Sequence, residues 1–335
     1  MHSLMITKYG DLNTSLEIQE VPIPAIGPNQ ILIKSHAASF NPLDFKTVRG
    51  DFKAIRKIQF PIGIGRDVSG VIEKVGEKVK KFKVGDKVYS RIDENFVGTM
   101  AEYVISNAAD VALMPSNLNF REAASIPLAG LTVYQSLIDI AKLSSGNNIL
   151  IHAGSGGVGT IAIQLSKYLG ANVTTTTSTK NISMLKELGA DNVIDYTKQS
   201  YLEIGDKFDV VFDTLGGHYT LDSFKVLKAD GRVVSIAGDL DSATTKQLGL
   251  NKIIRYVLAL KAKKITKAAS KIGAQYRFLL MSPNGDQLKE LTKLYESNSI
   301  KPVIDETFNF DDSIQALDYL SKGRARGKVI VQFMD

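Results

Sequence analysis

The stretch that decides the fold is NILIHAGSGGVGTIAIQLSKYLG, residues 148–170. It opens with an apolar run, Ile149 to Ile151, passes through a glycine-rich segment, residues 154–159, and then repeats apolar residues at helical spacing until Gly170. This order predicts a strand, a glycine turn and a helix, which is the setting in which a G-x-G-x-x-G pattern binds a dinucleotide. A plain strand-to-helix turn with flexible glycines is the alternative interpretation.

Each glycine of the predicted turn has a physical task. Gly154 allows the tight turn, Gly156 lets the backbone approach a pyrophosphate closely, and Gly159 lets the helix pack against the strand. Backbone N–H groups at the start of a helix have no intrahelical partner, so they face the anion. The predicted cofactor-binding residues of the turn are Gly154, Ser155, Gly156, Gly157, Val158 and Gly159.

Length and composition indicate an ordinary globular protein. The chain has 335 residues, of which 44% are hydrophobic and 23% charged, and this length suits two domains. No apolar run approaches the roughly 18 residues that a membrane span needs, and residues 1–10 do not resemble a secretory signal. We therefore predict a cytoplasmic protein without a membrane span. Because cysteine is absent, disulfides, thiol nucleophiles and thiolate metal ligands are excluded.

The formal net charge of +6 suits an anionic ligand such as a phosphorylated cofactor, but most of the cations are spread along the chain. Only residues 252–271 are locally dense in them, with Lys252, Arg255, Lys261, Lys263, Lys264, Lys267 and Lys271. Tyr256 is the only aromatic residue in this segment, whereas a nucleic-acid surface usually combines basic and aromatic side chains. The segment is interpreted as a solvated helical face, and no nucleic-acid partner is predicted.

The pattern of apolar runs predicts an α/β protein. Residues 1–122 contain short apolar runs separated by glycine and proline turns, which favour antiparallel strands. Residues 120–129 and 131–142 look helical, and strands then alternate with helices, which favours a parallel sheet covered on both faces. The predicted strands include residues 208–213 and 275–281, and residues 288–297 are predicted to be a helix.

Residues 299–335 return to strand patterns around one helical segment. We predict a discontinuous β-rich domain of residues 1–122 and 299–335, with the cofactor domain, residues 123–298, inserted into it.

Several motifs together resemble the medium-chain dehydrogenase/reductase superfamily, specifically its zinc-free quinone and enone reductase branch. They are NPLDFK at 41–46 with Arg49 and Gly50, GRDVSG at 65–70, VGDKVY at 84–89, AGLTVY at 129–134, and HAGSGGVG at 152–159. The resemblance implies a GroES-like catalytic domain built from both chain ends, a doubly wound Rossmann domain for NADP between them, and a substrate cleft at their junction. It also implies a homodimer formed through the edge of the Rossmann sheet.

The positions that hold zinc in alcohol dehydrogenases of this superfamily differ here. Their Cys-x-x-Asp motif corresponds to residues 41–44, NPLD, and their Gly-His-Glu motif to residues 65–67, GRD. Their third ligand, a cysteine, falls near residues 128–130, LAG, and the four-cysteine lobe of a structural zinc is missing. No metal is therefore predicted. The histidines lack ligand spacing and are assigned to packing or the surface; they are His2, His36, His152 and His218.

The residues after the glycine turn favour NADPH. A Rossmann domain that prefers NAD places an acidic side chain about 20 residues beyond the turn. Residues 160–186 contain no aspartate or glutamate, while Ser178 and Lys180 can donate hydrogen bonds to a 2′-phosphate. Ordinary loop polarity is the alternative interpretation of these two residues. The resemblance adds Tyr196 and, with a weaker match, Arg326 as cofactor-binding candidates.

The resemblance also names residues for the nicotinamide end of the cleft. Thr132 is expected to hold the carboxamide, and Asn41 to bond the acceptor oxygen or an ordered water. Lys46 is expected to bond the cofactor ribose or stabilise an enolate, or else to be a surface cation. Arg66 stands in the place of a zinc-ligand histidine, so it either points into that place or turns outward to a carboxylate.

These observations predict an NADPH-dependent reductase that transfers hydride to quinones or α,β-unsaturated carbonyl compounds without zinc. Such acceptors take hydride on an electron-poor carbon and spread the charge, so they need positioning and hydrogen bonds more than a Lewis acid. The alternatives are a non-catalytic NADPH-binding protein, structural or RNA-associated as some relatives resembling zeta-crystallin are, and a reductase of simple ketones. The sequence leaves the acceptor open.

Overall fold

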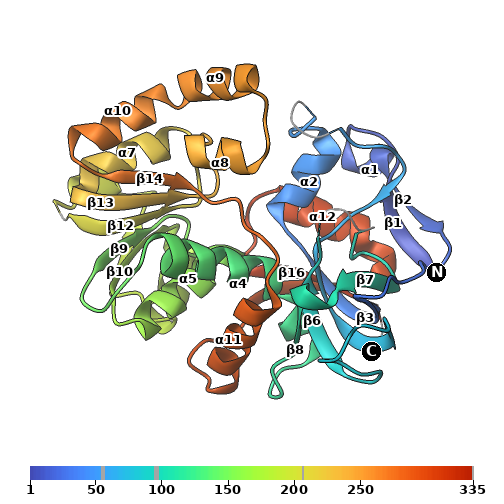
Figure 1. Cartoon of the computed structure of the whole chain (residues 1–335). Coiled ribbons are helices and arrows are strands. Elements are labelled where there is room, and N and C mark those ends of the chain that lie inside the picture. Colours follow the sequence, from blue (N-terminus) through green and yellow to red (C-terminus); the bar gives the residue numbers. More distant parts are fainter. Residues whose placement is uncertain (54–56, 94–97, 206, 334–335) are drawn as a thin grey trace. The chain divides into compact units, whose positions relative to one another are not determined.

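The computed structural model describes residues 1–53, 57–93, 98–205 and 207–333. The chain forms two compact units (Figure 1). Unit 1 comprises Met1–Leu131 and Ser282–Asp335, and unit 2 comprises Thr132–Met281. The unit ends therefore differ from the boundaries predicted after residue 122 and before residue 299.

Unit 1 contains a seven-stranded sheet in which both ends of the chain take part. The strand order is β15-β16-β3-β5-β6-β8, and β7 also pairs with β3. β16 runs antiparallel to β3 and sets Val329 opposite Phe40, which joins the two ends. The strands are β3 (Gln30–Phe40), β5 (Asp67–Val75), β6 (Lys87–Arg91), β7 (Tyr103–Asn107), β8 (Val111–Leu113), β15 (Ile304–Asn309) and β16 (Lys328–Gln332). The predicted β-rich fold of the chain ends is confirmed.

A smaller sheet and several helices complete unit 1. Its strand order is β2-β1-β4. The strands are β1 (His2–Ile6), β2 (Leu16–Glu20) and β4 (Ile62–Gly63); the helices are α1 (Leu12–Ser15), α2 (Pro42–Arg49), α3 (Phe120–Ala124), α11 (Gly285–Glu296) and α12 (Ser313–Ser321), with 3₁₀ turns at Ala108–Asp110 and Phe310–Asp312. Phe40, Val48 and Leu317 meet in one buried apolar cluster, so β3, α2 and α12 share a core.

Unit 2 is built on a six-stranded, wholly parallel sheet of order β11-β10-β9-β12-β13-β14. The strands are β9 (Asn148–Ile151), β10 (Asn172–Thr177), β11 (Asn192–Asp195), β12 (Phe208–Asp213), β13 (Leu227–Ser235) and β14 (Gln275–Phe278). β10 lies on one side of β9 and β12 on the other, so the strand order reverses at β9. This topology confirms the predicted doubly wound sheet, and ligands of such sheets bind where the order reverses.

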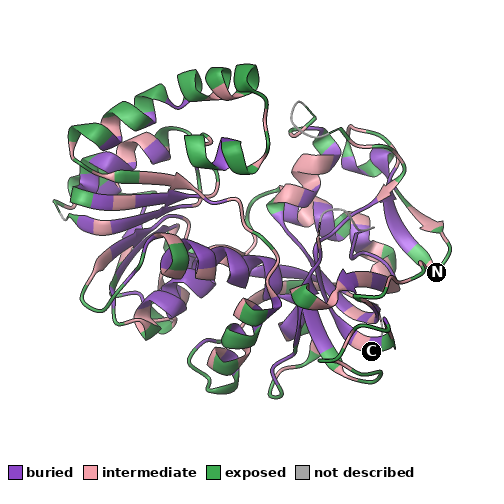
Figure 2. Ribbon diagram, in the orientation of Figure 1, coloured by how far each residue is buried: buried purple, intermediate pink, exposed green. Residues whose placement is uncertain are grey.

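Helices cover both faces of this sheet, with α7 and α10 on one side and α5 on the other (Figure 1). The helices of unit 2 are α5 (Gly157–Tyr168), α6 (Ile182–Glu187), α7 (His218–Val226), α8 (Ser242–Gln247), α9 (Lys252–Lys261) and α10 (Lys263–Lys271), with a π-helical turn at Gln135–Ile140 and 3₁₀ turns at Thr179–Asn181 and Tyr201–Glu203. The central strands are buried (Figure 2). Burial on both faces explains the continuous apolar run Ile149 to Ile151 in β9.

Three predicted helices differ from the observed ones. The helix predicted over residues 131–142 is formed by the end of α4 (Pro127–Tyr134) and the π-helical turn at Gln135–Ile140. The predicted helix over residues 120–129 is divided into α3 and α4 (Pro127–Tyr134), because Pro127 begins a new helix at the first position, where its missing N–H costs nothing. The helix predicted at residues 288–297 is α11, which begins earlier because Asn284 caps it by accepting a hydrogen bond from Gln287 N.

α11 belongs to unit 1, where the Tyr89 hydroxyl donates to Leu288 O at 2.7 Å. No helix within the described residues is both long enough and apolar enough to span a membrane.

Candidate active site

The glycine turn links the end of β9 to the start of α5, and two of its glycines are required by close packing. A Cβ on Gly154 would lie 2.1 Å from Thr175 Oγ1, and one on Gly159 would lie 2.5 Å from Ala153 O. Gly154 was predicted to provide the backbone freedom of the turn. The left-handed residue is instead Ala153, with φ of +50°, and Gly154 is needed for space against β10.

Gly156 has a different environment. It is the N-cap of α5 in an extended conformation, with φ of −79° and ψ of 168°. An added Cβ would meet only Ala153 O, at 3.6 Å, so the missing side chain leaves open space above the backbone. The N–H groups of the first turn of α5, which includes Gly157 and Val158, project from a helix N-terminus. A bare backbone at this end of a helix fits a pyrophosphate.

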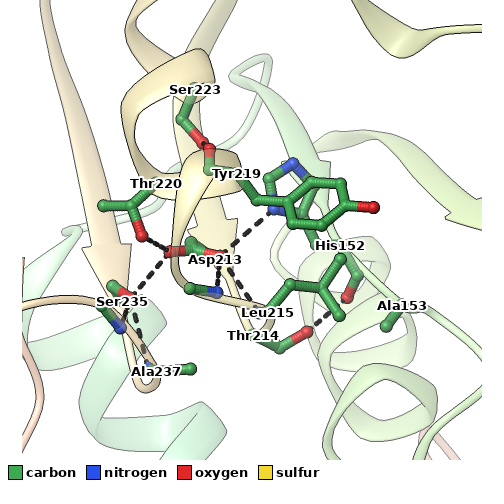
Figure 3. A network of polar contacts seen from close by, with 12 residues as sticks. His152, Ala153, Asp213, Thr214, Leu215, Tyr219, Thr220, Ser223, Ser235 and Ala237 are labelled. Carbon is green, nitrogen blue, oxygen red and sulfur yellow. Dashed lines mark hydrogen bonds and ion pairs between the residues drawn. The ribbon is translucent and has the colours of Figure 1, made fainter.

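The loop after β12 is held beside the glycine turn by a buried carboxylate, Asp213 (Figure 3). β12 pairs with β9, so this loop lies where the strand order reverses. Thr214 Oγ1 donates to His152 O at 2.8 Å and ties the loop to the end of β9. The donors to Asp213 are Thr220 Oγ1 (2.5 Å), Ser235 Oγ (2.8 Å), Leu215 N (3.0 Å) and Gly216 N (2.9 Å), with His152 Nδ1 at 3.4 Å.

Asp213 is a structural anion. Burial raises the pKa of its carboxyl, but the hydrogen bonds from His152 and Thr220 outweigh burial and lower the pKa to about 2. His152 is itself buried, with its ring 5.0 Å from that of Tyr201 and 5.7 Å from that of Tyr219. His152 therefore packs in the core, which is one of the two roles predicted for the histidines. Of the others, His36 stacks on Phe120, His218 contacts Tyr219, and His2 lies 3.6 Å from Glu102.

Three predicted residues for the 2′-phosphate gather at the carboxyl ends of β10 and β11. Ser178 follows β10 directly, and Lys180 is exposed in the 3₁₀ turn after it. Tyr196 follows β11, is exposed, and donates its backbone N–H to Thr177 O at 3.0 Å. Arg326 belongs to unit 1, where its Nε lies 3.8 Å from Asp305 Oδ1.

Sequence reasoning missed one acidic residue at this edge, Asp195. It ends β11, beyond the acid-free stretch of residues 160–186, and it accepts from Thr179 Oγ1 at 2.5 Å and from Thr197 Oγ1 at 2.6 Å. These hydrogen bonds lower the pKa of the carboxyl to about 2. The Asp195 carboxylate is therefore negatively charged at neutral pH, and it contacts Thr179, which lies between Ser178 and Lys180. Spacing along the chain does not reveal Asp195. The expectation that β10 and β11 pair in parallel could have located it, because this pairing sets Asp195 beside Thr177 at the end of β10.

In unit 1, a buried polar cluster forms around Asp67. Asn41 Nδ2 donates to Asp67 Oδ2 at 2.8 Å, and Ser39 Oγ donates to the same oxygen at 2.8 Å. Lys328 Nζ lies 3.1 Å from Asp67 Oδ2 and 2.5 Å from Asn41 Oδ1, and Leu128 N donates to Asp67 Oδ1 at 2.7 Å. Lys328 is only 5% exposed, so this ammonium is paired inside the protein. Sequence reasoning missed Lys328, because a lysine at the start of a strand looks like a surface residue.

The other predicted residues of unit 1 lie around this cluster. Arg66, directly before β5, is buried, so it does not turn outward. Lys46 is half-buried in the last turn of α2, of which Asn41 is the N-cap. Asp44 Oδ2 accepts from Asn41 N at 2.7 Å. Thr132, the remaining candidate, is a buried residue of α4 and belongs to unit 2.

Asp44 gives the stability a measurable pH dependence. Burial raises the pKa of its carboxyl from 3.8 to about 6, against the opposing effects of the Asn41 N–H and the Arg66 charge. The folded state therefore holds this proton more tightly than the unfolded state, so the contribution of Asp44 to stability is greatest below about pH 4 and is lost as the pH rises through about 6. A shift of this size corresponds to about 3 kcal/mol.

We therefore expect the unfolding free energy of Asp44→Asn, relative to wild type, to rise by about 2 kcal/mol between pH 4 and pH 7, because part of the full difference is already lost at pH 4. Urea denaturation of both proteins across this range measures the difference. If the difference in unfolding free energy between Asp44→Asn and wild type does not change with pH, the raised pKa assigned to Asp44 is wrong.

The donor set around Asp67 does not fit zinc. Asn41 stands where zinc-dependent alcohol dehydrogenases of the superfamily have a ligand cysteine. Arg66 and Asp67 stand where those enzymes have the histidine and glutamate of their Gly-His-Glu motif. Lys328 Nζ already supplies the positive charge between Asn41 and Asp67. Zinc prefers sulfur and imidazole ligands, and the Lys328 ammonium between Asn41 and Asp67 would repel it. Within the described residues, no cluster of three potential metal ligands occurs.

Comparisons with known proteins identify the family of the chain. Residues 27–116 match the model of the alcohol dehydrogenase GroES-like domain, and residues 188–331 match a model described as zinc-binding dehydrogenase. The chain is 39% identical to 2-methylene-furan-3-one reductase from Solanum lycopersicum and 35% identical to the chloroplastic NADPH-dependent alkenal/one oxidoreductase from Arabidopsis thaliana. Each alignment covers 99% of this chain and 79% of the relative.

Among solved structures, the quinone oxidoreductase from Coxiella burnetii matches with a TM-score of 0.86 and 32% identity, over 99% of both chains. A GroES-like unit into which a doubly wound parallel sheet is inserted defines a dehydrogenase/reductase of two domains. The chain belongs to the medium-chain dehydrogenase/reductase superfamily, in its quinone oxidoreductase branch.

Proposed function

We propose that this chain is an NADPH-dependent reductase that transfers hydride to quinones or α,β-unsaturated carbonyl compounds without a metal. One observation carries the proposal: the place that holds zinc in related alcohol dehydrogenases contains an amide, a carboxylate and a lysine ammonium that are bonded to one another. This cluster offers hydrogen bonds and no Lewis acid. The relatives named above as enone and quinone reductases support the same class of acceptor.

The residues of unit 2 fit the cofactor. The bare backbone at Gly156 and the N-terminus of α5 receive the pyrophosphate, with Ser155 beside them. Ser178, Lys180 and Tyr196 lie together at the strand ends where the 2′-phosphate would bind, and Thr132 is assigned to the nicotinamide carboxamide. NADPH supplies the hydride when it is bound.

Asn41 is assigned to the acceptor. Its Oδ1 accepts from Lys328 and one amide hydrogen goes to Asp67, so the amide is fixed at both ends. No acceptor within the described residues takes the second amide hydrogen, which is left to donate to a carbonyl or quinone oxygen or to an ordered water. Lys46 and Arg66 carry the positive charge that would stabilise an enolate as it forms. Asn41, Lys46 and Arg66 can therefore stabilise the negative charge that develops on the acceptor oxygen during hydride transfer.

The test follows oxidation of NADPH and NADH by absorbance, with a quinone, a 2-alkenal and a simple ketone as acceptors, and with a chelator present. We expect turnover with NADPH on the first two acceptors, little turnover on the ketone, and no effect of the chelator. Lys180→Glu should raise the NADPH KM by about tenfold, because a carboxylate there repels the 2′-phosphate. Equal use of NADH would refute the cofactor assignment, and no turnover with any acceptor would favour a non-catalytic binding protein.

A homodimer and a cytoplasmic location remain predictions. β14 is an edge strand of the sheet of unit 2. On its outer side, however, Phe278 N donates to Asp241 Oδ2 and Phe278 O accepts from Thr244 Oγ1, so the homodimer rests on the resemblance to the family.

A further inference from the structure

One segment of unit 2 has a charge pattern that the proposed function does not use. Residues 242–281 contain no aspartate or glutamate. They contain Lys246, Lys252, Arg255, Lys261, Lys263, Lys264, Lys267, Lys271 and Arg277. The cations concentrate on α9 and α10, which follow one another with only Ala262 between them. This segment carries the largest local excess of positive charge in the chain, and it was interpreted from sequence as a solvated helical face.

The structure shows that α9 also presents an apolar stripe to solvent. Ile253, Tyr256, Val257 and Leu260 follow helical spacing along one side, with exposed fractions of 77%, 67%, 52% and 53%. All ten residues of α9 are described, and none of them is buried (Figure 2). A solvated face explains the lysines, but it does not explain why aliphatic and aromatic side chains are lined up toward water.

α9 is held in place by its neighbour. Ile265 and Ala269 of α10 are buried in the apolar cluster of unit 2, whereas Lys263, Lys264 and Lys267 of the same helix are exposed. Asn251 caps α9 by accepting from Ile254 N at 2.9 Å. A helix of this length is marginal in water without packing. α10 therefore anchors a helix whose own apolar side is left for another surface.

A groove of about 820 Å³ runs beside α9 within unit 2. Its lining combines Lys252, Arg255 and Lys263 with Tyr256 and Ala259. It also includes Asp241, whose carboxylate is paired with Arg277 Nε at 3.1 Å. Cationic groups beside small apolar ones suit an anionic headgroup joined to a hydrocarbon chain.

We propose that α9 and α10 form a docking surface for an anionic phospholipid bilayer, with α9 lying in the plane of the interface. A basic helix with an exposed apolar stripe binds such surfaces by burying the stripe at the boundary between headgroups and acyl chains, while its lysines contact the lipid phosphates. The proposal goes beyond the reductase activity and does not depend on it.

The same observations disfavour two other occupants. A second copy of this surface would bring two acid-free segments, each dense in cations, against one another, and they would repel. A nucleic acid would pair with the cations but would leave the aliphatic stripe of Ile253, Val257 and Leu260 unsatisfied.

The test measures co-sedimentation of the full chain with phosphatidylcholine vesicles that contain or lack phosphatidylglycerol, at low and high salt. One variant carries Ile253→Ser, Tyr256→Ser and Leu260→Ser, and a second carries Lys263→Gln, Lys264→Gln and Lys267→Gln. The matched controls change exposed residues of unit 1: Val84→Ser with Leu113→Ser, and Lys78→Gln, Lys80→Gln with Lys83→Gln. Thermal unfolding of each variant checks that the fold is retained.

We expect binding only to the anionic vesicles and weaker binding at high salt. The lysine variant should lose on the order of 100-fold in affinity and the serine variant at least about tenfold, while each control stays within about twofold of wild type. Absence of binding to anionic vesicles at low salt would overturn the proposal. Two other results would overturn it as well: RNA binding that the serine variant retains and that exceeds vesicle binding, or a lipid-free dimer that the serine variant dissociates.

Discussion

Gly156→Val is expected to weaken NADPH binding by on the order of 100-fold or more, equivalent to about 3 kcal/mol, while the protein stays folded. The valine side chain would project into the open space above the start of α5, where only Ala153 O lies within 4 Å of the added Cβ. The backbone of Gly156 is in the extended region that valine readily adopts, so the change introduces no strain. Calorimetric titration with NADPH measures the affinity, and thermal unfolding without cofactor measures the stability.

The other glycines of the turn supply the matched controls. Gly154→Ala places a Cβ 2.1 Å from Thr175 Oγ1, so buried side chains must shift, and Gly159→Ala places one 2.5 Å from Ala153 O, so the backbone must move. These variants should lose about 1–3 kcal/mol of stability, as overpacked sites do, with any loss of affinity following from the distortion. Undiminished NADPH affinity in Gly156→Val would show that the pyrophosphate binds elsewhere.

The sequence predicted the fold best where burial is complete. The observed β12, FDVVFD, coincides with the predicted strand at residues 208–213, because its apolar residues, Phe208 and residues 210–212, are all buried in the sheet of unit 2. Apolar periodicity was less informative for α9. It marks a stripe along a helix, but it does not tell whether the tertiary structure covers that stripe, and here the stripe is exposed.

The candidate site depended on contacts between distant parts of the chain. The hydrogen bond between Lys328 and Asn41 spans 287 residues, and no local pattern distinguishes a buried, paired lysine from a solvated one. The glycine turn was recognisable because its residues are neighbours in sequence. The family resemblance located Asn41 and Asp67, but nothing in the sequence added Lys328 to them, because β3, β5 and β16 meet only in the folded sheet.

Lys328→Met is expected to destabilise the protein by about 3–5 kcal/mol, because it leaves Asp67 buried without its ammonium partner. The same change removes the donor to Asn41 Oδ1, so the amide is no longer fixed at both ends. If Asn41 bonds the acceptor, kcat should fall by about tenfold or more while the KM for NADPH stays near wild type. Urea denaturation and steady-state kinetics measure the two effects.

Two companion variants separate charge from packing. Lys328→Arg keeps the cation and should retain more stability than Lys328→Met. Asp67→Asn combined with Lys328→Met removes both charges, so the double variant should be more stable than Lys328→Met alone, since the main cost is the unpaired carboxylate rather than the lost pair. A double variant that is instead less stable, with losses that simply add, would show that Asp67 and Lys328 are not coupled. In that case another residue must orient Asn41.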